Sequence, residues 1–388
     1  MKIAPTFVVV ALIAVACGAS QGSNASSTAG SATKTITIGN LAMSTGAGAP
    51  QNTDWQNGLK LAIDQANSQG YLKQWDTKLV VESQETASDP TTAVTTFQEF
   101  ANRKVPVVTL GALSTIAQPL DPIATSTQTV LIGNVTVGTP AEDYEFRIVD
   151  TVTPFVEYGT QLAQRKFKRV AALINGDNPA FAKLVGNLSI GLQQGGGAIV
   201  GTQKVSSTTT DYSAALTNIL TLRPDAIFLG LLDEQAGNAA IQIRATAGLA
   251  TVQLAAISSV SPLLSKIAGK AATGMLLNPG FVPGNPAFAT FNQGYAKASG
   301  GRVPTVTSAL GYQAGWLIAI ALKQALAAGQ SVTGSSLRQQ IPSASQSADM
   351  KKISLVNEFS IAASGDAHFG DLLAEFNSSG AIVPAPKS

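Results

Sequence analysis

The chain has 388 residues, of which 12% are charged, and its formal net charge is +2. A chain of this length can form two domains of ordinary size. It has no basic cluster beyond Arg165–Arg169, which argues against a nucleic-acid partner, because such partners are held by clustered lysines and arginines. One cysteine and one histidine supply no disulfide framework and only poorly supply a metal centre or a catalytic triad, so no cofactor or metal is expected.

The N-terminus has the pattern of a secretory signal. Lys2 precedes an apolar run, Phe7–Ala16, that is too short to span a bilayer, and small residues lead up to Cys17. This pattern resembles a bacterial lipoprotein signal covering residues 1–17, in which the cysteine becomes the first mature residue and carries the lipid. Ala14 stands where leucine is more usual, so a plain secretory signal is the alternative.

A tether rich in glycine, serine, alanine and threonine follows at residues 18–34, and its composition is typical of a flexible linker. It contains Gly18-Ala19-Ser20-Gln21-Gly22, which matches the nucleophile elbow of hydrolases in form only, because no strand precedes it and no helix follows. The sequence also lacks a phosphate-binding G-x-x-x-x-G-K-[ST] loop and a recognisable nucleophile–base pair. An enzymatic function is therefore not expected.

Strands and helices alternate from Thr35 onward, which predicts an α/β lobe with a parallel sheet and right-handed crossovers. Asp89 and Pro90 give the second helix a clear start, as N-cap and first helical residue. The expected strands are Thr35–Leu41, Lys78–Glu82, Val105–Leu110 and Thr129–Gly133, and the expected helices are Asp54–Ser68, Pro90–Asn102 and Ile116–Thr127.

The third of these strands leads into a candidate site. Val105–Leu110 reads as a strand buried on both faces; Gly111 ends it, and Ser114 and Thr115 follow just ahead of a helix. Ligands of open α/β sheets bind at the carboxyl ends of strands, where hydroxyls and free helix N–H groups can receive an anion or a carbonyl. The alternative is that Ser114 or Thr115 only caps the helix.

A second α/β series follows Arg147–Thr151, so the chain is expected to form two similar doubly wound lobes. Its predicted elements are the helices Pro154–Arg165, Phe181–Gln194, Tyr212–Leu222 and Glu234–Gly248, and the strands Val170–Asn175, Ala198–Val205, Asp225–Leu231 and Val252–Ile257. Two more helices, Ala287–Ala298 and Thr305–Ala328, come after Met275–Asn278. The last helix is almost entirely apolar or small and is predicted to be buried against a lobe rather than to cross a membrane.

These features together resemble the leucine/isoleucine/valine-binding proteins, the solute-binding components of ABC importers. The resemblance rests on ITIGNLAMSTGAG, NGLKLAIDQANSQGY, DPTTAVTTFQEFANRKVPVVTLGALSTIAQPLDPIA and KRVAALINGDNPAF, in this order and spacing behind a lipoprotein-like signal. It extends over Thr35–Ser388. It implies the type I periplasmic-binding-protein fold, in which two lobes joined by three crossing strands close on a ligand.

The resemblance also implies a domain organisation and a location. The crossings are expected near Arg147–Thr151, near Leu276–Phe281 and in the 340s to 350s. The N-terminal lobe would comprise residues 35–148 plus 280–345, and the C-terminal lobe residues 149–279 plus 346–388. The protein would act as a monomer, anchored by lipid on the outer side of the bacterial cell membrane, and its partners would be a small-molecule ligand and the ABC permease subunits.

Candidate ligand contacts in the first lobe follow from the same resemblance. A hydroxyl after the third strand holds the ligand carboxylate in the family, and Ser114, with Thr115 adjacent, matches it. A second contact loop after the fourth strand corresponds to Asn134, Val135 and Thr136. A wall position after the first strand falls at Gln51, whereas the nearby Trp55 is assigned to the following helix.

The second lobe departs further from the family. Phe181 is the nearest candidate for an aromatic wall residue, with core packing as its alternative, and Leu232 takes the next aromatic position. The acidic residue that pairs with an α-ammonium group aligns with Ser258. A charge left unpaired in a closed cleft costs several kcal/mol, so this replacement favours a carboxylate or amide with an apolar group over an α-amino acid, unless Asp233 or Asp177 supplies the charge.

The resulting expectation is an extracytoplasmic solute-binding lipoprotein of an ABC importer. The alternative is a ligand-sensing receptor module of the same fold that signals to a partner protein, and fold alone does not decide between the two. His368 lies in a glycine-bounded hairpin near the C-terminus, where no catalytic role is expected.

Overall fold

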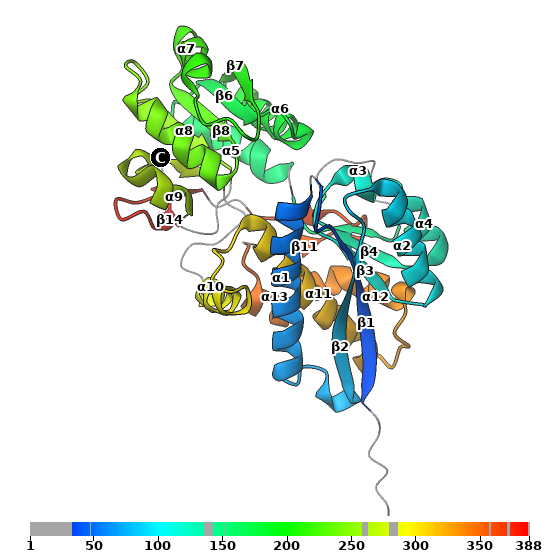
Figure 1. Cartoon of the computed structure of the whole chain (residues 1–388). Helices are drawn as coiled ribbons and strands as arrows, with labels where there is room; N and C mark the ends of the chain where they lie inside the picture. The colour runs from blue at the N-terminus through cyan, green and yellow to red at the C-terminus, as the bar shows by residue number, and fades with distance from the viewer. Residues whose placement is uncertain are drawn as a thin grey trace, which may run out of the picture.

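The computed structural model describes residues 33–46, 48–135, 143–150, 152–257, 263–278, 286–356, 358–370 and 373–386. It forms two α/β lobes, which are connected at one side and diverge from each other at the other (Figure 1). The predictions for the signal, Cys17, Thr136, Ser258 and the tether up to residue 32 lie outside the described residues, whereas Lys34, the predicted end of the tether, begins the first strand.

The first lobe contains a five-stranded sheet in the order β2-β1-β3-β4-β5, and every neighbouring pair is parallel. Its strands are β1 (Lys34–Ala42), β2 (Thr77–Glu85), β3 (Val107–Leu110), β4 (Val130–Gly133) and β5 (Glu145–Arg147). Its helices are α1 (Ala49–Ser68), the short η1 (Lys73–Trp75), α2 (Pro90–Asn102), α3 (Ser114–Ala117), α4 (Asp121–Thr127), α10 (Pro286–Ala298), α11 (Val306–Ala327), α12 (Gly334–Ser345) and α13 (Ala348–Ile353).

The second lobe contains a seven-stranded sheet in the order β14-β13-β10-β9-β8-β6-β7. Its strands are β6 (Arg169–Asn175), β7 (Ala198–Val205), β8 (Ala226–Gly230), β9 (Gln253–Ala256), β10 (Leu276–Leu277), β13 (Ala374–Phe376) and β14 (Ile382–Pro384). Its helices are α5 (Thr153–Gln164), α6 (Pro179–Gln194), α7 (Ser213–Thr221), α8 (Asp233–Ala245), α9 (Leu263–Ala268) and the short η2 (Gly269–Ala272). The strands β6 to β10 pair in parallel, whereas β13 and β14 add an antiparallel edge. The predicted α/β class with two parallel-sheet lobes is confirmed.

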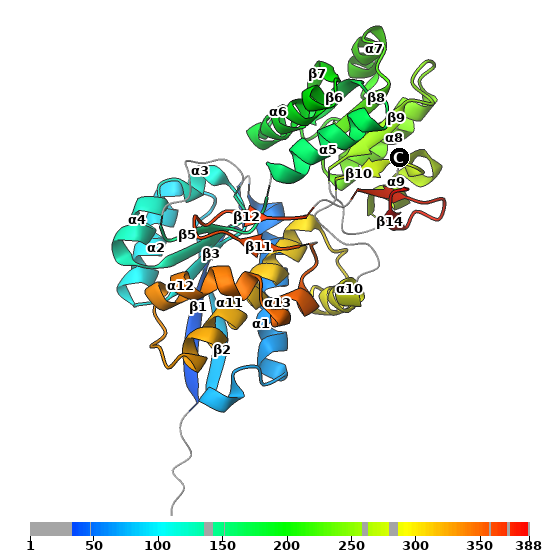
Figure 2. The ribbon, with the colours of Figure 1, turned by 180° about the vertical axis from the view of Figure 1, so that it is seen from behind.

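Helices that follow β10 in the chain return to the first lobe. Figure 2 shows α10 to α13, coloured yellow to orange, on the lobe that contains β1. The helix α11 begins with a capping box in which Thr305 and Ser308 exchange hydrogen bonds, and most of its side chains are buried, as predicted. No helix among the described residues is long and apolar enough to span a membrane.

The C-terminal segment corrects the expected position of the third crossing. Met350, Phe359 and Phe369 are buried in the first-lobe core, while Leu373 is buried in the second. The chain therefore crosses between residues 369 and 373, and not in the 340s to 350s. Residues 348–369, including the hairpin of β11 (Ser360–Ile361) and β12 (Ala367–His368), belong to the first lobe instead of the second.

The predicted helix at Ile116–Thr127 is also wrong in detail, because it is two helices. The first, α3, ends at Ala117, and α4 begins at Asp121. Pro119 lies between them, and it has no N–H group to donate to the carbonyl of the residue four positions earlier, so the helix does not continue through it. The short α3 places Ser114 and Thr115 in its first turn, directly after the buried strand β3.

Candidate ligand-binding cleft

A cavity of about 500 Å³ lies between the lobes. The first lobe contributes Gln51, Asp54, Ala112, Leu113, Ser114, Thr115, Gln118, Asn134, Thr305, Val306, Thr307 and Leu310 to its lining. The second lobe contributes Pro154, Phe155, Asn178, Pro179, Ala180, Phe181, Leu184, Leu232, Asp233, Glu234, Ile257 and Leu263. Val149, Asp150, Asn278 and Phe369, from the segments that join the lobes, complete the lining. The volume suits a small organic molecule.

The loop after β3 forms part of the first-lobe wall. Leu113 has a φ of +67°, which is uncommon for a residue with a side chain, and its neighbour Ser114 begins α3. The N-cap of α3 is Leu113, and no side chain caps the helix. The alternative that Ser114 or Thr115 is merely a capping residue is therefore wrong.

The prediction for the contact loop after β4 is confirmed in part. Asn134 lines the cavity; its backbone N–H donates to the Leu110 carbonyl (3.0 Å) and its side-chain Nδ2 to the Gly111 carbonyl (3.2 Å). These bonds join the loops after β3 and β4. Val135, by contrast, is buried (3% exposed) in the first-lobe core and does not line the cavity.

The second-lobe wall includes both predicted apolar residues. Leu232 is 47% exposed at the start of α8, and Phe181 faces the cavity while also packing in the second-lobe core. Asp233 and Asp177 were the two acids that could pair with a ligand ammonium group in place of the acid missing at Ser258. Asp233 lines the cavity. Asp177 does not, and it accepts hydrogen bonds from the N–H (2.7 Å) and hydroxyl (2.8 Å) of Ser207.

Several lining residues were not anticipated from the sequence. The first turns of α11 contribute Val306, Thr307 and Leu310, and the joining segments contribute Asp150, Asn278 and Phe369. The signal for Asp150 and Asn278 was present, since both fall inside segments expected to cross between the lobes. The signal for α11 was the Thr305 cap at the start of a strongly predicted helix.

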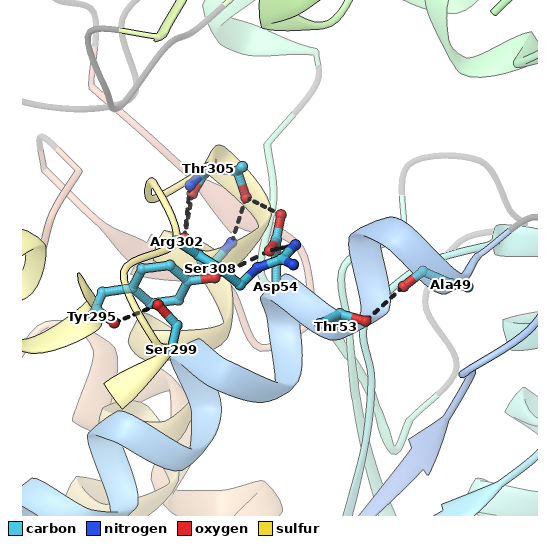
Figure 3. A network of polar contacts seen from close by, with 8 residues as sticks. All are labelled: Ala49, Thr53, Asp54, Tyr295, Ser299, Arg302, Thr305 and Ser308. Atoms are coloured by element: carbon cyan, nitrogen blue, oxygen red, sulfur yellow. Dashed lines mark hydrogen bonds and ion pairs between the residues drawn. The ribbon is translucent and has the colours of Figure 1, made fainter. Parts of the chain in front are cut away.

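Asp54, which lines the cavity, anchors a polar network that supports the first-lobe wall (Figure 3). Its carboxylate accepts hydrogen bonds from the Tyr295 hydroxyl (3.1 Å), Arg302 (2.9 Å) and the Thr305 hydroxyl (2.9 Å). The bond to Asp54 raises the pKa of Arg302, and burial raises the pKa of Tyr295. The network joins α1 to α10 and to the N-terminus of α11, which fixes the helices that form this wall.

The described lining carries four acids, Asp54, Asp150, Asp233 and Glu234, and no lysine, arginine or histidine. The side chain of Asp150 is 5% exposed, and burial raises the pKa of its carboxyl, although it accepts N–H bonds from Val152, Thr153 and Phe369. Within the described ranges, no three His, Cys, Asp or Glu side chains are grouped to hold a metal ion.

Two lobes that enclose a cavity at their joining segments define the class of two-lobed ligand-binding proteins. The family model for periplasmic binding proteins matches residues 35–361, and the chain belongs to this family. Members of the family are solute-binding proteins of transport systems rather than enzymes, and membership implies an extracytoplasmic location. No curated protein matches the sequence.

Solved structures share the fold at low sequence identity. A branched-chain amino acid ABC transporter protein from Thermus thermophilus with bound valine is 16% identical, with a TM-score of 0.74 over 92% of this chain and 96% of that one. A solute-binding protein from Rhodopseudomonas palustris BisB5 in complex with 3,4-dihydroxy benzoic acid is 22% identical, with a TM-score of 0.70 over 90% and 95%. The substrate-binding protein LivJ from Streptococcus pneumoniae in complex with isoleucine is 19% identical, with a TM-score of 0.67 over 91% and 100%. The resemblance to branched-chain amino acid binding proteins is thus confirmed at the level of the fold.

Proposed function

We propose that the protein captures a small organic ligand in the cleft between its lobes and delivers it to the permease of an ABC importer. The observation that carries this proposal is the 500 Å³ cavity, which is lined by both lobes and by all three joining segments. A ligand that touches both walls binds the closed arrangement more tightly than the open one, and this difference in affinity drives closure. The closed form is then the form that a permease recognises.

The lining favours a ligand with an apolar body and one polar end. Ser114 and Thr115 offer hydroxyls at the carboxyl end of β3, while Leu232, Phe181 and Phe155 offer apolar surface opposite. A small carboxylate, an amide or an amino-acid-like molecule fits this description. Gln51 and Asn134 add amide groups to the first-lobe wall; Thr136 and Ser258 remain proposed contacts from the loops after β4 and β9.

We further propose that Cys17 is lipidated and anchors the protein to the outer side of the cell membrane. The support is the apolar run before Cys17 and the polar tether after it, which would keep the cleft accessible above the lipid surface. The variant Cys17→Ser should be released into the medium. Retention of this variant at the membrane would contradict lipid attachment.

A thermal-shift screen tests ligand capture directly. Amino acids, aromatic acids, short acyl acids and their amides should include one class that raises the melting temperature, because ligand at about 100 times its Kd adds roughly 2.7 kcal/mol. X-ray scattering should show a more compact molecule with that ligand. If no compound raises the melting temperature or changes the scattering, capture in the cleft is disproved; if only branched-chain amino acids do, the inference from Ser258 is wrong.

The alternative function, a receptor that signals to a partner protein, uses the same cleft and the same closure. Vesicles that contain the permease and ATPase separate the two functions, since only an importer component stimulates ATP hydrolysis and uptake of its ligand. Binding without any stimulation, together with recovery of a non-permease partner, would support the alternative.

A further inference from the structure

Asn278 occupies a fixed position at the joining end of the cleft. It directly follows β10, and its backbone N–H donates to the Ala256 carbonyl (3.1 Å). The Tyr158 hydroxyl donates to the carbonyl of Leu276 (2.9 Å), two residues earlier. The residue is 2% exposed and lines the cavity. Its backbone is therefore held by the second lobe while its surroundings include the joining segments.

The side chain of Asn278 differs from the other described asparagines that line the cavity. Asn134 donates to Gly111, and Asn178 accepts from the N–H of Ala180 (2.9 Å). Both carboxamide atoms of Asn278, Oδ1 and Nδ2, are buried without a hydrogen-bond partner. Since a buried unpaired polar group is destabilising, the Asn278 side chain costs stability at a position beside the cavity.

The charge around Asn278 limits what can satisfy it. The neighbouring joining segment contributes Asp150, whose carboxyl is buried, and the described lining includes no cationic side chain. A carboxylate brought to this end would meet Asp150, whose neighbour His368 (Nδ1–Oδ2 3.6 Å) is a cation only when it is protonated, and two acids close together are unfavourable in a cleft of low dielectric. A neutral group with one donor and one acceptor side by side meets no such penalty.

We propose that Asn278 is a specificity-determining residue that pairs with a primary carboxamide of the ligand. The ligand N–H donates to Asn278 Oδ1, and Asn278 Nδ2–H donates to the ligand carbonyl. Both Asn278 atoms are inaccessible from the cavity in the present arrangement, so the pair forms only when closure of the lobes shifts the Asn278 side chain toward the ligand. This inference rests on the proposed capture function and narrows its ligand class to small amides with an apolar group.

Calorimetry with matched pairs tests the proposal, using acetamide and acetate, isovaleramide and isovalerate, and benzamide and benzoate. At least one amide should bind tenfold or more tightly than its carboxylate. Asn278→Leu, a change of similar volume, should weaken that amide by tenfold or more, and Asn278→Ala should do the same if the larger side chain impairs folding. The melting temperature of the empty Asn278→Leu protein should be equal to or higher than that of the unchanged protein, because an unpaired amide is removed.

The control is Asn292→Leu in α10, which removes a partly exposed amide whose buried oxygen has no hydrogen-bond partner and which lies outside the cavity lining. Its affinity for the amide should be unchanged. Tighter binding of carboxylates than of amides, or unchanged amide affinity in both Asn278 variants, would overturn the proposal. Binding of amino acids or carboxylates but of no amide would overturn the role of Asn278 while leaving the capture function intact. If calorimetry detects binding of no compound, both proposals are wrong.

Discussion

Gly111 lies directly against the side chain of Trp55. A Cβ atom placed on Gly111 would be 2.6 Å from both Cβ and Cγ of Trp55, closer than real Cβ atoms approach. Trp55 is fully buried in α1, and on another side Gly311 of α11 approaches its backbone, where an added Cβ would lie 2.4 Å from the Trp55 carbonyl oxygen. Two glycines therefore allow α1 to pack closely against the β3 loop and against α11, both of which line the cleft.

The substitution Gly111→Ala should destabilise the protein and weaken ligand binding. The added methyl group has no room beside Trp55, and overpacking of this kind costs about 1–3 kcal/mol. Relief of the clash must shift the loop that contains Ser114, so the affinity for the ligand should fall as well. Urea unfolding and calorimetry measure the two effects.

Gly186→Ala in α6 is the matched control, because a Cβ there meets no atom within 4 Å. Alanine at a helical glycine should leave stability unchanged or raise it by up to about 1 kcal/mol. If Gly111→Ala behaves like this control, the close packing of Gly111 on Trp55 does not constrain the loop.

The double variant Ser114→Ala, Thr115→Val tests the hydroxyls at the cleft. Ligand affinity should fall more than tenfold, which corresponds to about 1.4 kcal/mol or more. Folding should survive, since neither side chain caps α3 and Thr115 is exposed. The melting temperature of the empty variant checks this second expectation. An unchanged affinity would place the polar end of the ligand elsewhere in the cleft.

The parts of the fold that could be predicted are those that depend on the pattern of apolar and polar residues within one short segment. The residues of β3, Val107–Leu110, are all buried, and a run of apolar residues predicts such a two-sided strand. The site loop then follows from topology, because ligands bind at the carboxyl ends of parallel strands. The same reasoning located Asn134, whereas the register within that loop misplaced Val135, which points into the core.

The parts that could not be predicted depend on contacts between distant segments. Asn278 and Leu310 reach the cleft only because the chain crosses between lobes, and no local periodicity records where a crossing residue faces. The segment at residues 348–369 was placed in the wrong lobe for a similar reason, whereas β13 and β14 lie in the predicted one. The strands β11 and β12 of this segment have two residues each, too short for an alternating pattern, although Phe359 and Phe369 pack together in the first-lobe core.

The variant Arg302→Ala should destabilise the first lobe through Asp54. Asp54 is 8% exposed, so loss of Arg302 leaves a nearly buried carboxylate with only the hydroxyls of Tyr295 and Thr305. Because the Arg302 side chain is itself about half exposed, water replaces part of the interaction, and the expected loss is about 1–3 kcal/mol.

Lys60→Ala provides the comparison for Arg302→Ala. Lys60 pairs with Asp64 on the surface of α1, with both side chains more than half exposed, and such pairs contribute about 0.5 kcal/mol or less. Denaturant unfolding of the two variants measures the difference. Equal, small losses would mean that Asp54 does not need Arg302 as its partner.

Asp150 should make stability depend on pH in the direction opposite to a surface ion pair. Burial raises the pKa of its carboxyl above the ordinary value of 3.8, so the folded protein binds this proton more tightly than the unfolded chain. Stability from this group is present at low pH and falls as pH rises from the unfolded value through the raised pKa. Between pH 3 and 7, the free energy of unfolding of Asp150→Asn should therefore rise relative to that of the unchanged protein as pH rises.

His368 acts on the same carboxyl. Its Nδ1 lies 3.6 Å from Asp150 Oδ2 and favours the ionised carboxylate when protonated, so His368→Gln should steepen the loss of stability with rising pH. A variant Asp150→Asn that instead gains as pH falls would show that the fold prefers the carboxylate.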